Sequence, residues 1–462
     1  MTNLPDLWYT TYHIIRKIYA KNFRSIGELT FDLSFAEGKA PNDYEEMERL
    51  PFVSQGKSRC PPVTAMFGPN AAGKSNIVKA LIMLMKMMRG DFPFRPYPGN
   101  VQEHGQVTDA LPHDKNQLLN LGDDITLGLE YSVQGNDCLY KITYNGNGIK
   151  DELFSTNGNM RFHAVNGIEI EFGSDVKMPS KEYTPDTFAK ALKTECVDMN
   201  GRPVRTFASL FLSKYAGLDN LTRTCLSELL TSLMIIPAQM LESPAEELGL
   251  LIDSLSKLTG EDKTAVLSKI VEILKCLDLD IQSINITEIP VFIGNPPPFN
   301  TTEDITSKAQ KIALQIKSVH RDVNGELRLF DFLFSESDGT IRLAVMIARF
   351  LYILKRGGTL CVDELEKSLH PVLVRELLKL FKMRQYNSNN AQLIFTTHLA
   401  QLLDDTILRL SEVAIVDKNR WHGTTVRRLT DMKVEGEKIR NVTNFRKRYL
   451  MGYYSGVPHA AL

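Results

Sequence analysis

The first hundred residues change from an alternating to a helical spacing of hydrophobic side chains. Between Glu28 and Phe35 every second residue is apolar, which is the period of a half-buried strand. A polar stretch over 36–55 predicts a loop, and the apolar run 63–67 predicts a second, buried strand. From Asn76 onward apolar residues recur at helical spacing. The predicted order is therefore strand, loop, strand and, after a short loop, helix.

The middle of the chain carries two further patterns. Alternating runs between 125 and 172 are separated by Gly and Asn turn signals, and they predict an antiparallel sheet. From about 187 to 279 the spacing becomes helical, and Ser243-Pro244-Ala245-Glu246 supplies an N-cap, a first-turn proline and an N3 glutamate. The proline run Pro296–Pro298 predicts a loop after these helices. The patterns indicate an antiparallel β subdomain followed by a helical insertion.

The last third of the chain returns to strands. Strand-like segments at 281–293 and 312–329 precede a predicted helix from Thr340 to about Leu354. Short, largely apolar runs at 360–363 and 393–396 are typical of parallel strands that are buried on both faces. Together with the earlier segments they predict an α/β fold with a mixed central sheet.

The composition is that of an ordinary soluble globular protein. The chain has 462 residues, 43% of them hydrophobic, with 54 basic and 55 acidic side chains. A formal charge of -1 excludes a strongly basic nucleic-acid coat and leaves a local basic patch open. The six cysteines lack CxxC spacing, which predicts reduced core thiols rather than a disulfide framework or a zinc ribbon. With no signal peptide and no membrane-length apolar run, we expect a cytoplasmic protein without a membrane partner.

One segment fits the P-loop pattern completely, and it lies between a predicted strand and a predicted helix. Its residues are Gly68, Pro69, Asn70, Ala71, Ala72, Gly73, Lys74 and Ser75, followed by Asn76 in the helix. Backbone N–H groups of such a loop and the positive helix end can wrap phosphates. Lys74 can reach the β and γ oxygens, and the Ser75 hydroxyl can hold Mg²⁺. We therefore predict that the residues from Gly68 to Asn76 bind ATP together with Mg²⁺. The strand before the loop and the helix after it argue against a chance glycine turn.

Two further motifs end strands in the last third of the chain. Asp363 and Glu364 end an apolar run, as in a Walker B segment, where the first can hold Mg²⁺ and the second can activate the attacking water. About thirty residues later, His398 ends another strand and can contact the γ-phosphate or the water. An acidic pair after a strand is often only a helix N-cap, and a histidine there is usually structural. Their order after a P-loop favours the catalytic interpretation.

In this order the motifs resemble those of the ABC-type ATPases of the SMC and RecF kind. Ser337, Gly339 and Thr340 occupy the signature position, and Glu366–Pro371 looks like the D-loop. The resemblance implies an ABC-type P-loop NTPase fold in which Ser337 and Gly339 of one subunit close over the γ-phosphate held by another. It therefore implies a homo-oligomer with head-to-tail composite sites. Asp338 departs from the small residue usual at its position, and no Q-loop glutamine can be identified.

Four segments carry a closer resemblance, namely Asn22–Ile26, expected within the first strand, Ser337–Thr340, Asp363–Glu366 and the terminal stretch Tyr449–Pro458. They are similar to segments of the stand-alone ATPases of bacterial anti-phage defence and abortive-infection operons, including the ATPase subunits of Septu, PARIS and AbiL-type systems. The resemblance implies an ATPase encoded beside an effector, often a nuclease, which the ATPase holds in check or releases. The sequence contains no HNH-like or Toprim-like cluster, so any cutting of nucleic acid requires another chain.

A DNA-binding ATPase of the RecF or SMC kind, acting in DNA repair or recombination, is the alternative function. The stretch Lys418–Arg448 supports it with ten basic and three acidic residues, although such a run is usually a solvated face. A long coiled-coil arm is excluded, because hairpins and short helices fill the stretch between P-loop and signature. We expect an N-terminal lobe with the P-loop (1–186), a helical insertion (187–280) and a C-terminal lobe with the remaining motifs (281–462). The helical part of the insertion, from about Ser243 to Asp280, has two open interpretations, a lid packed on the nucleotide domain and a role in assembly or partner docking.

Overall fold

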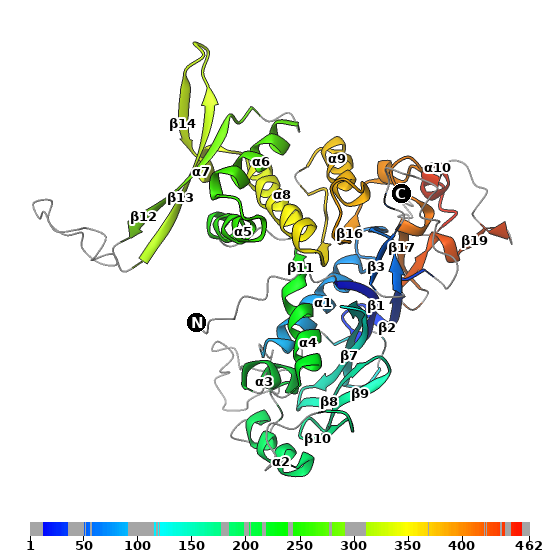
Figure 1. The fold of residues 1–462 in the computed structure, drawn as a ribbon. Helices are drawn as coiled ribbons and strands as arrows, with labels where there is room; N and C mark the ends of the chain where they lie inside the picture. Colours follow the sequence, from blue (N-terminus) through cyan, green and yellow to red (C-terminus); the bar gives the residue numbers. More distant parts are fainter. Residues whose placement is uncertain are drawn as a thin grey trace, which may run out of the picture. The chain divides into compact units, whose positions relative to one another are not determined.

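The fold is described from a computed structural model of the chain, shown in Figure 1. The described residues are 13–35, 50, 52–55, 58–90, 115–116, 119, 121–176, 184–197, 203, 205–214, 219–238, 244–276, 280–291, 311–367, 369–419, 421, 423–434, 437–438 and 445–454.

The chain forms two compact units, and each is described by itself. The larger, here called the P-loop unit, comprises Thr10–Ala238, Gly357–Glu366 and Arg375–Leu462. The described residues of the smaller, here called the arm unit, lie within Gln239–Arg356 and Lys367–Val374. The boundaries of these two units differ from those of the three predicted lobes. The division into 1–186, 187–280 and 281–462 stays a prediction.

The P-loop unit contains a six-stranded mixed sheet. Across the sheet the strands are β11 (Leu233–Ile236), β15 (Thr359–Val362), β16 (Gln392–Thr397), β5 (Val63–Phe67), β17 (Val413–Lys418) and β18 (Thr424–Arg428). The first five run parallel, and β18 is antiparallel to β17. Every residue of β5, β15 and β16 is buried, as their apolar runs predict. The predicted mixed central sheet is confirmed.

A second sheet in the same unit is antiparallel throughout. In order its strands are β10 (Glu169–Phe172), β9 (Asn159–Val165), β8 (Gly148–Thr156), β7 (Asn136–Asn145), β6 (Ile125–Val133), β1 (His13–Phe23) and β2 (Ile26–Asp32). The predicted antiparallel subdomain is confirmed. The alternating run that begins at Glu28 lies partly in β2, so it also belongs to this sheet. The segment Asn22–Ile26, expected within one strand, instead contains the turn between β1 and β2, where Asn22 and Arg24 have positive φ.

Helix α1 (Lys74–Met88) belongs to a hydrophobic core that contains residues of both sheets. Its apolar stripe, from Ile77 to Met88, is mostly buried. The same cluster of buried side chains includes Tyr131 of the seven-stranded sheet and Ile394 of the six-stranded sheet. The predicted strand, loop and helix around the P-loop are therefore confirmed, and the helix that carries Lys74 and Ser75 is anchored by this core.

The other elements in the described part of the P-loop unit are shorter than α1. They are β3 (Val53–Gln55), β4 (Ser58–Cys60), α2 (Pro185–Cys196), α3 (Phe207–Lys214), α4 (Asn220–Ser232), β19 (Lys433–Val434), β20 (Glu437–Lys438) and α10 (Phe445–Leu450). Helix α9 (Pro371–Lys382) has most of its residues in this unit. Three single-turn helices are Ala400–Leu402, Leu410–Glu412 and Leu429–Asp431.

A buried glutamate on β8 caps helix α3. The Glu152 carboxylate accepts hydrogen bonds from the N–H groups of Phe207 (2.6 Å) and Ala208 (2.9 Å) and from the Tyr140 hydroxyl (2.9 Å). Unpaired N–H groups and the helix dipole favour a carboxylate at a helix N-terminus. Burial nevertheless raises the pKa of Glu152 to about 7, because the desolvation of the charged form outweighs these bonds.

This raised pKa predicts a pH-dependent stability. The folded state holds the Glu152 proton more tightly than the unfolded chain, so its contribution is present at acid pH and is lost as the pH rises from about 4.5 to about 7. We expect Glu152→Gln to remove this part of the pH dependence, which is on the order of 3 kcal/mol in the free energy of unfolding. Urea unfolding of both proteins across this pH interval checks the expectation, and parallel pH curves would contradict it.

The arm unit combines helices with a three-stranded antiparallel sheet (Figure 1). The sheet contains β12 (Ser283–Val291), β13 (Lys311–Arg321) and β14 (Leu327–Asp331) in this order. Its helices are α5 (Pro244–Thr259), α6 (Lys263–Cys276), α7 (Phe332–Ser335) and α8 (Asp338–Arg356). Helix α5 packs on α8, where Glu247 forms an ion pair with the buried Arg349. The predicted helix that begins near Thr340 is confirmed as α8.

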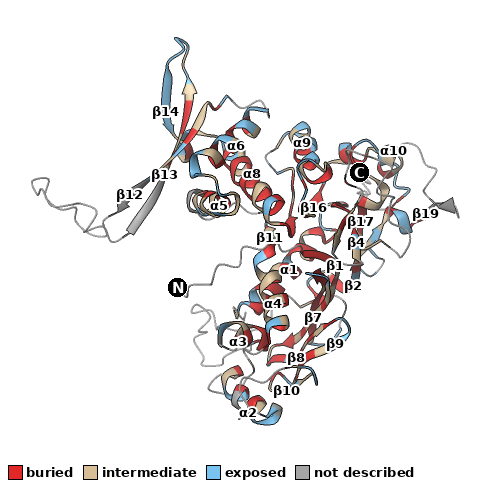
Figure 2. Ribbon diagram, in the orientation of Figure 1, coloured by how far each residue is buried: buried red, intermediate tan, exposed pale blue. Residues whose placement is uncertain are grey.

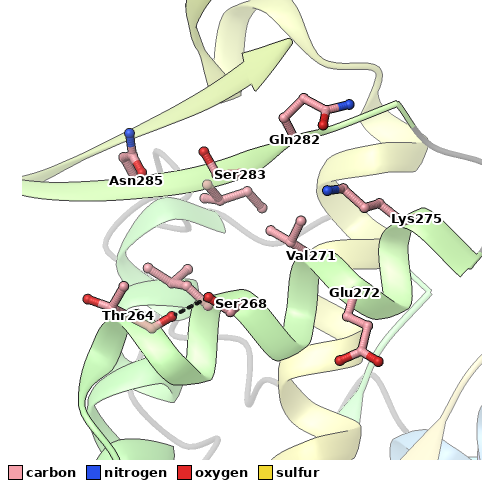
Figure 3. Close-up of a pocket in the computed structure, with 10 residues that line it drawn as sticks. Thr264, Ser268, Val271, Glu272, Lys275, Gln282, Ser283 and Asn285 are labelled. Atoms are coloured by element: carbon pink, nitrogen blue, oxygen red, sulfur yellow. Dashed lines mark hydrogen bonds between the residues drawn. The ribbon is translucent and has the colours of Figure 1, made fainter. Parts of the chain in front are cut away.

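A groove of about 320 Å³ lies between α6 and β12 in the arm unit, as Figure 3 shows. Val271 contributes to its apolar lining, and the Lys275 side chain extends toward Gln282 of the segment that enters β12. Glu272 points away from the strand. None of the residues predicted to bind the nucleotide or Mg²⁺ lines this groove.

Two sequence-based expectations need correction. The stretch 187–279 is not helical throughout, because β11 lies within it and pairs with β15 in the parallel sheet. Its run Leu233-Met234-Ile235-Ile236 is too short for its periodicity to distinguish a strand from a helix. Of the six cysteines predicted as core thiols, five are buried and Cys276 is exposed.

Several predicted features lie outside the described residues. They are most of the loop 36–55, the N-cap Ser243, the Pro296–Pro298 loop and the end of the Tyr449–Pro458 segment. Among the described residues, no helix combines the length and the apolar character that crossing a membrane requires.

Candidate nucleotide site

The parallel strands bring three predicted motifs to one edge of the central sheet. Phe67 of β5 is the register partner of Thr397 of β16, so the P-loop and His398 start from neighbouring positions. Strand β15 pairs with the other side of β16, and Asp363 follows it directly. Because the carboxyl ends of parallel strands meet at the same edge, the P-loop, the acidic pair and the histidine lie together.

The two P-loop glycines are required for different reasons. Gly73 has a φ of 104°, in the left-handed region, and a Cβ there would lie 2.0 Å from the Thr424 hydroxyl oxygen. A Cβ on Gly68 would lie 2.1 Å from the backbone carbonyl oxygen of Val416 in β17. Asn70 and Ala71 are exposed at the outer part of the loop. The loop therefore makes a tight turn at the N-terminus of α1, which is the arrangement that binds phosphate.

A hydrogen-bond network pins the loop to distant parts of the chain. The Thr424 hydroxyl donates to the carbonyl of Ala72 (2.9 Å) and lies 2.7 Å from the Ser25 hydroxyl. The side-chain amide of Asn76, a residue predicted to bind the nucleotide, donates to the same Ser25 hydroxyl (2.7 Å). Sequence reasoning missed the roles of Ser25 and Thr424, since neither belongs to a local motif of the P-loop.

The Lys74 side chain is buried against the P-loop. Its ammonium group donates to the carbonyls of Gly68 (2.7 Å) and Pro69 (3.0 Å) and lies 3.4 Å from Nδ1 of His398. Burial lowers the pKa of Lys74 to about 8, and the opposing effect of Glu366, then of Asp363 and Glu364, raises it. The three carboxylates thus help to keep the ammonium charged beside the place where a phosphate would lie.

Ser75 and Asp363 meet in a geometry that suits Mg²⁺. The Ser75 hydroxyl donates to Oδ1 of Asp363 (3.1 Å), and Asp363 is buried. The described residues contain no group of three or more His, Cys, Asp or Glu side chains that could hold a metal ion. Two oxygen ligands from the chain fit Mg²⁺ nevertheless, because Mg²⁺ takes most of its ligands from water and from substrate phosphates. The metal-binding roles of both residues stay predictions.

Thr396 connects the Asp363 carboxylate to the backbone of Glu364, and sequence reasoning missed it. Its buried hydroxyl donates to Oδ1 of Asp363 (2.7 Å) and accepts from the N–H of Glu364 (2.7 Å). Glu364 has a φ of 54°, a left-handed conformation that is rare outside glycine and common at active sites. The bond from Thr396 therefore supports a strained residue at the position predicted for the general base.

His398 is held through its backbone N–H, and its ring is only partly buried. Its N–H donates to Oε1 of Glu366 (2.5 Å), in the segment predicted as the D-loop. Burial, and then the Lys74 charge, lowers the pKa of His398, so the neutral ring is favoured. Sequence reasoning also missed the contact of Glu366 with His398, although Glu366 belongs to the Asp363–Glu366 segment.

Removing the Thr396 hydroxyl tests its positioning role. We expect Thr396→Val to lower kcat for ATP hydrolysis about 10-fold to 100-fold with little change in KM, because Asp363 and Glu364 lose their shared anchor. Thr396→Ser should retain most of the rate. Thr64→Val is the matched control, since Thr64 is buried on β5 and its hydroxyl has no hydrogen-bond partner among the described residues. Equal losses of kcat in the two valine variants would refute the assignment.

The predicted signature lies at the start of α8 in the arm unit. The Ser337 hydroxyl accepts a hydrogen bond from the N–H of Thr340 (3.1 Å) and lies 2.9 Å from its hydroxyl. Ser337 and Asp338 are exposed, Gly339 is partly exposed and Thr340 is buried. Thr340 thus stabilises the helix start, and the contacts of Ser337, Gly339 and Thr340 with a nucleotide stay predictions.

A family model matches part of the chain. Residues 241–404 match the model of a family described as "AAA domain, putative AbiEii toxin, Type IV TA system". This segment contains the signature, the acidic pair and His398, and the P-loop lies outside it. No curated protein matches the chain.

The solved structures that match the chain include SMC heads and RecF. An SMC head bound to the C-terminal winged-helix domain of ScpA is 15% identical with a TM-score of 0.40, over 89% of this chain and 96% of that one. The SMC head domain from Thermotoga maritima is 12% identical with a TM-score of 0.37, over 90% and 98%. The recombination mediator protein RecF with ATP is 15% identical with a TM-score of 0.33, over 84% and 94%.

Proposed function

We propose that this protein is a Mg²⁺-dependent ATPase that hydrolyses ATP to ADP and phosphate. The observation that carries the proposal is the convergence of Lys74, Ser75, Asp363, Glu364 and His398 at one edge of the central sheet. Lys74 neutralises phosphate charge, and the loop N–H groups orient the phosphates. Mg²⁺, held through Ser75 and Asp363, supplies further charge neutralisation when bound. Glu364 takes the proton of the attacking water, and His398 orients the γ-phosphate or that water.

The active assembly is a homo-oligomer with composite sites. Ser337 and Gly339 of one subunit contact the γ-phosphate that Gly73 and Lys74 of another subunit hold. The exposure of Ser337 at the N-terminus of the 19-residue helix α8 supports this arrangement, since such a helix end attracts anions.

Mixing two inactive variants tests the composite sites. Ser337→Arg should bind ATP but not hydrolyse it, because the longer cation blocks closure over the phosphate. Lys74→Ala should fail to bind. A mixed head-to-tail dimer has one intact site, so the mixture should recover about a quarter of the wild-type rate. Absence of recovery, in a preparation whose mass shows mixed dimers, would count against shared sites.

We further propose that the assembly is a sensor and switch for a co-encoded effector, a nuclease, in anti-phage defence. The family description of residues 241–404, which names a toxin of a toxin–antitoxin system, supports this role, as do the segments that resemble defence ATPases. ATP-driven closure can control the effector only by the difference in affinity that the effector shows for closed and open forms.

The second candidate is a DNA-binding ATPase in repair or recombination. Arg427 and Arg446 are exposed and favour it, whereas Arg428 is engaged with the Ser34 carbonyl (2.6 Å) and with Asp431 (3.1 Å). Titration of the ATP-bound protein with the product of the neighbouring gene, and then with duplex DNA, separates the two functions. Salt-sensitive, ATP-dependent DNA binding with no response to the protein partner would favour the second candidate.

A further inference from the structure

Two hydroxyl groups are packed against the turn that ends the P-loop. Thr424 is the first residue of β18, and Ser25 lies in the turn between β1 and β2. A Cβ on Gly73 would lie 2.0 Å from the Thr424 hydroxyl oxygen and 2.8 Å from that of Ser25. Strand β17, between β5 and β18 in the sheet, is buried over its first four residues (Figure 2). The two hydroxyl groups therefore fill the space that a side chain at Gly73 would need.

The direction of each hydrogen bond in this cluster follows from the protons that are available. The Ala72 carbonyl can only accept, so the Thr424 hydroxyl donates its single proton to it (2.9 Å). Thr424 must then accept in its bond with the Ser25 hydroxyl (2.7 Å), which uses the proton of Ser25. Ser25 in turn accepts from the side-chain amide of Asn76 (2.7 Å). One directed chain therefore runs from the Asn76 amide to the Ala72 carbonyl through two hydroxyl groups.

The chain ends at a peptide group whose other end faces away from β18. The Ala72 carbonyl and the Gly73 N–H belong to one planar trans peptide, so they point in opposite directions. Because the carbonyl is bonded to Thr424, the Gly73 N–H is directed away from Thr424. Ala72 and Thr424 are each 2% exposed, and a buried carbonyl is costly to leave without a partner. The Thr424 hydroxyl therefore favours one orientation of this peptide.

We propose that Thr424 is a positioning residue for the nucleotide, which holds the Gly73 N–H in the orientation that binds a phosphate oxygen. The inference rests on the proposed ATP binding. Backbone N–H groups of a P-loop bind the α- and β-phosphates, which ADP shares with ATP. Fixing the peptide before the nucleotide arrives lowers the conformational cost of binding. Ser25 and Asn76 support Thr424 from the other end of the chain of hydrogen bonds.

The substitution Thr424→Val removes the hydroxyl and keeps the shape of the side chain. The Thr424 N–H still donates to the Ser25 carbonyl (2.8 Å), so the fold should persist. We expect the affinities for ATP and for ADP to fall about 10-fold, because the Gly73 peptide is no longer held. A phosphate contact made equally in the ground and transition states changes KM alone, so kcat should change less than about 3-fold. Thr424→Ser should restore both affinities.

The next residue of the same strand provides the matched control. The Thr425 hydroxyl also donates to a backbone carbonyl, that of Asp417 (3.2 Å) on β17, which is outside the P-loop. Successive residues of a strand point to opposite faces, so Thr425→Val removes a similar bond on the other face. It should leave both affinities and kcat unchanged. Calorimetry with ATP and with ADP gives the affinities, and steady-state hydrolysis gives KM and kcat.

Ser25→Ala is the second variant if Thr424→Val fails to fold. Ser25 is partly exposed, and losing its proton weakens the chain one step earlier, so both affinities should fall about 3-fold. A folded variant that binds ATP and ADP as tightly as Thr425→Val, or that loses kcat alone, would overturn this inference and leave the proposed ATPase standing. Failure of Thr424→Ser to restore binding would also overturn it. A wild-type chain that binds no ATP would overturn the proposed function itself.

Discussion

Replacing Lys74 with alanine should abolish detectable ATP binding while the protein stays folded. The Lys74 ammonium is the basic group that the loop carbonyls of Gly68 and Pro69 hold beside the phosphate position. It neutralises several phosphate charges at once in a partly dehydrated site, so we expect the affinity to fall by at least about 100-fold. Calorimetric titration with ATP and Mg²⁺ measures this loss.

A second lysine of the same helix provides the control for this experiment. Lys79 lies on the exposed face of α1, five residues after Lys74. Lys79→Ala removes the same charge from the same helix and should keep wild-type affinity. If a folded Lys74→Ala protein binds ATP as well as Lys79→Ala does, the P-loop assignment is wrong.

Glu364→Gln should stop hydrolysis while ATP stays bound. The glutamine keeps the size of the side chain and the backbone bond to Thr396, but it cannot accept the proton of the attacking water. General-base catalysis is worth about 100-fold to 10,000-fold, and we expect kcat to fall within that range. The variant should accumulate as the closed, ATP-bound assembly, because hydrolysis no longer resets it.

Single-turnover hydrolysis and sedimentation measure the two parts of this expectation. Glu376→Gln is the matched control, since Glu376 is exposed on α9 and pairs only weakly with Lys379 at the surface. It should hydrolyse ATP at the wild-type rate. If Glu364→Gln retains more than about a tenth of that rate, another residue is the general base.

The elements with a clear local pattern were predictable from the sequence. The P-loop and α1 follow from a contiguous motif and from helical spacing, and the antiparallel sheet over 125–172 follows from its alternating runs. The burial of β15 and β16 follows from apolar runs that leave no polar face. The spacing of apolar residues is a property of the segment itself, so it predicts the element before any partner strand is known.

Other features became defined only when distant segments met. The run Leu233–Ile236 is a strand because it pairs with β15 at the edge of the parallel sheet. Nothing in its local sequence distinguishes it from a buried turn of helix. The cap that Glu152 makes on α3 joins residues 55 and 56 positions apart. Its raised pKa depends on burial, which is a property of the assembled core and not of the residue type.

The candidate site divides in the same way. The sequence by itself determined the candidates for phosphate, metal and proton chemistry, because Lys74, Ser75, Asp363 and Glu364 belong to short motifs with known spacing. Only the tertiary structure decided how they are held: Thr396 reaches Asp363 because β15 and β16 are parallel neighbours, and the chain positions they join are 33 apart. Hydrogen bonds between residues so far apart in the sequence follow from the order of strands in the sheet, and no local pattern of residues encodes that order.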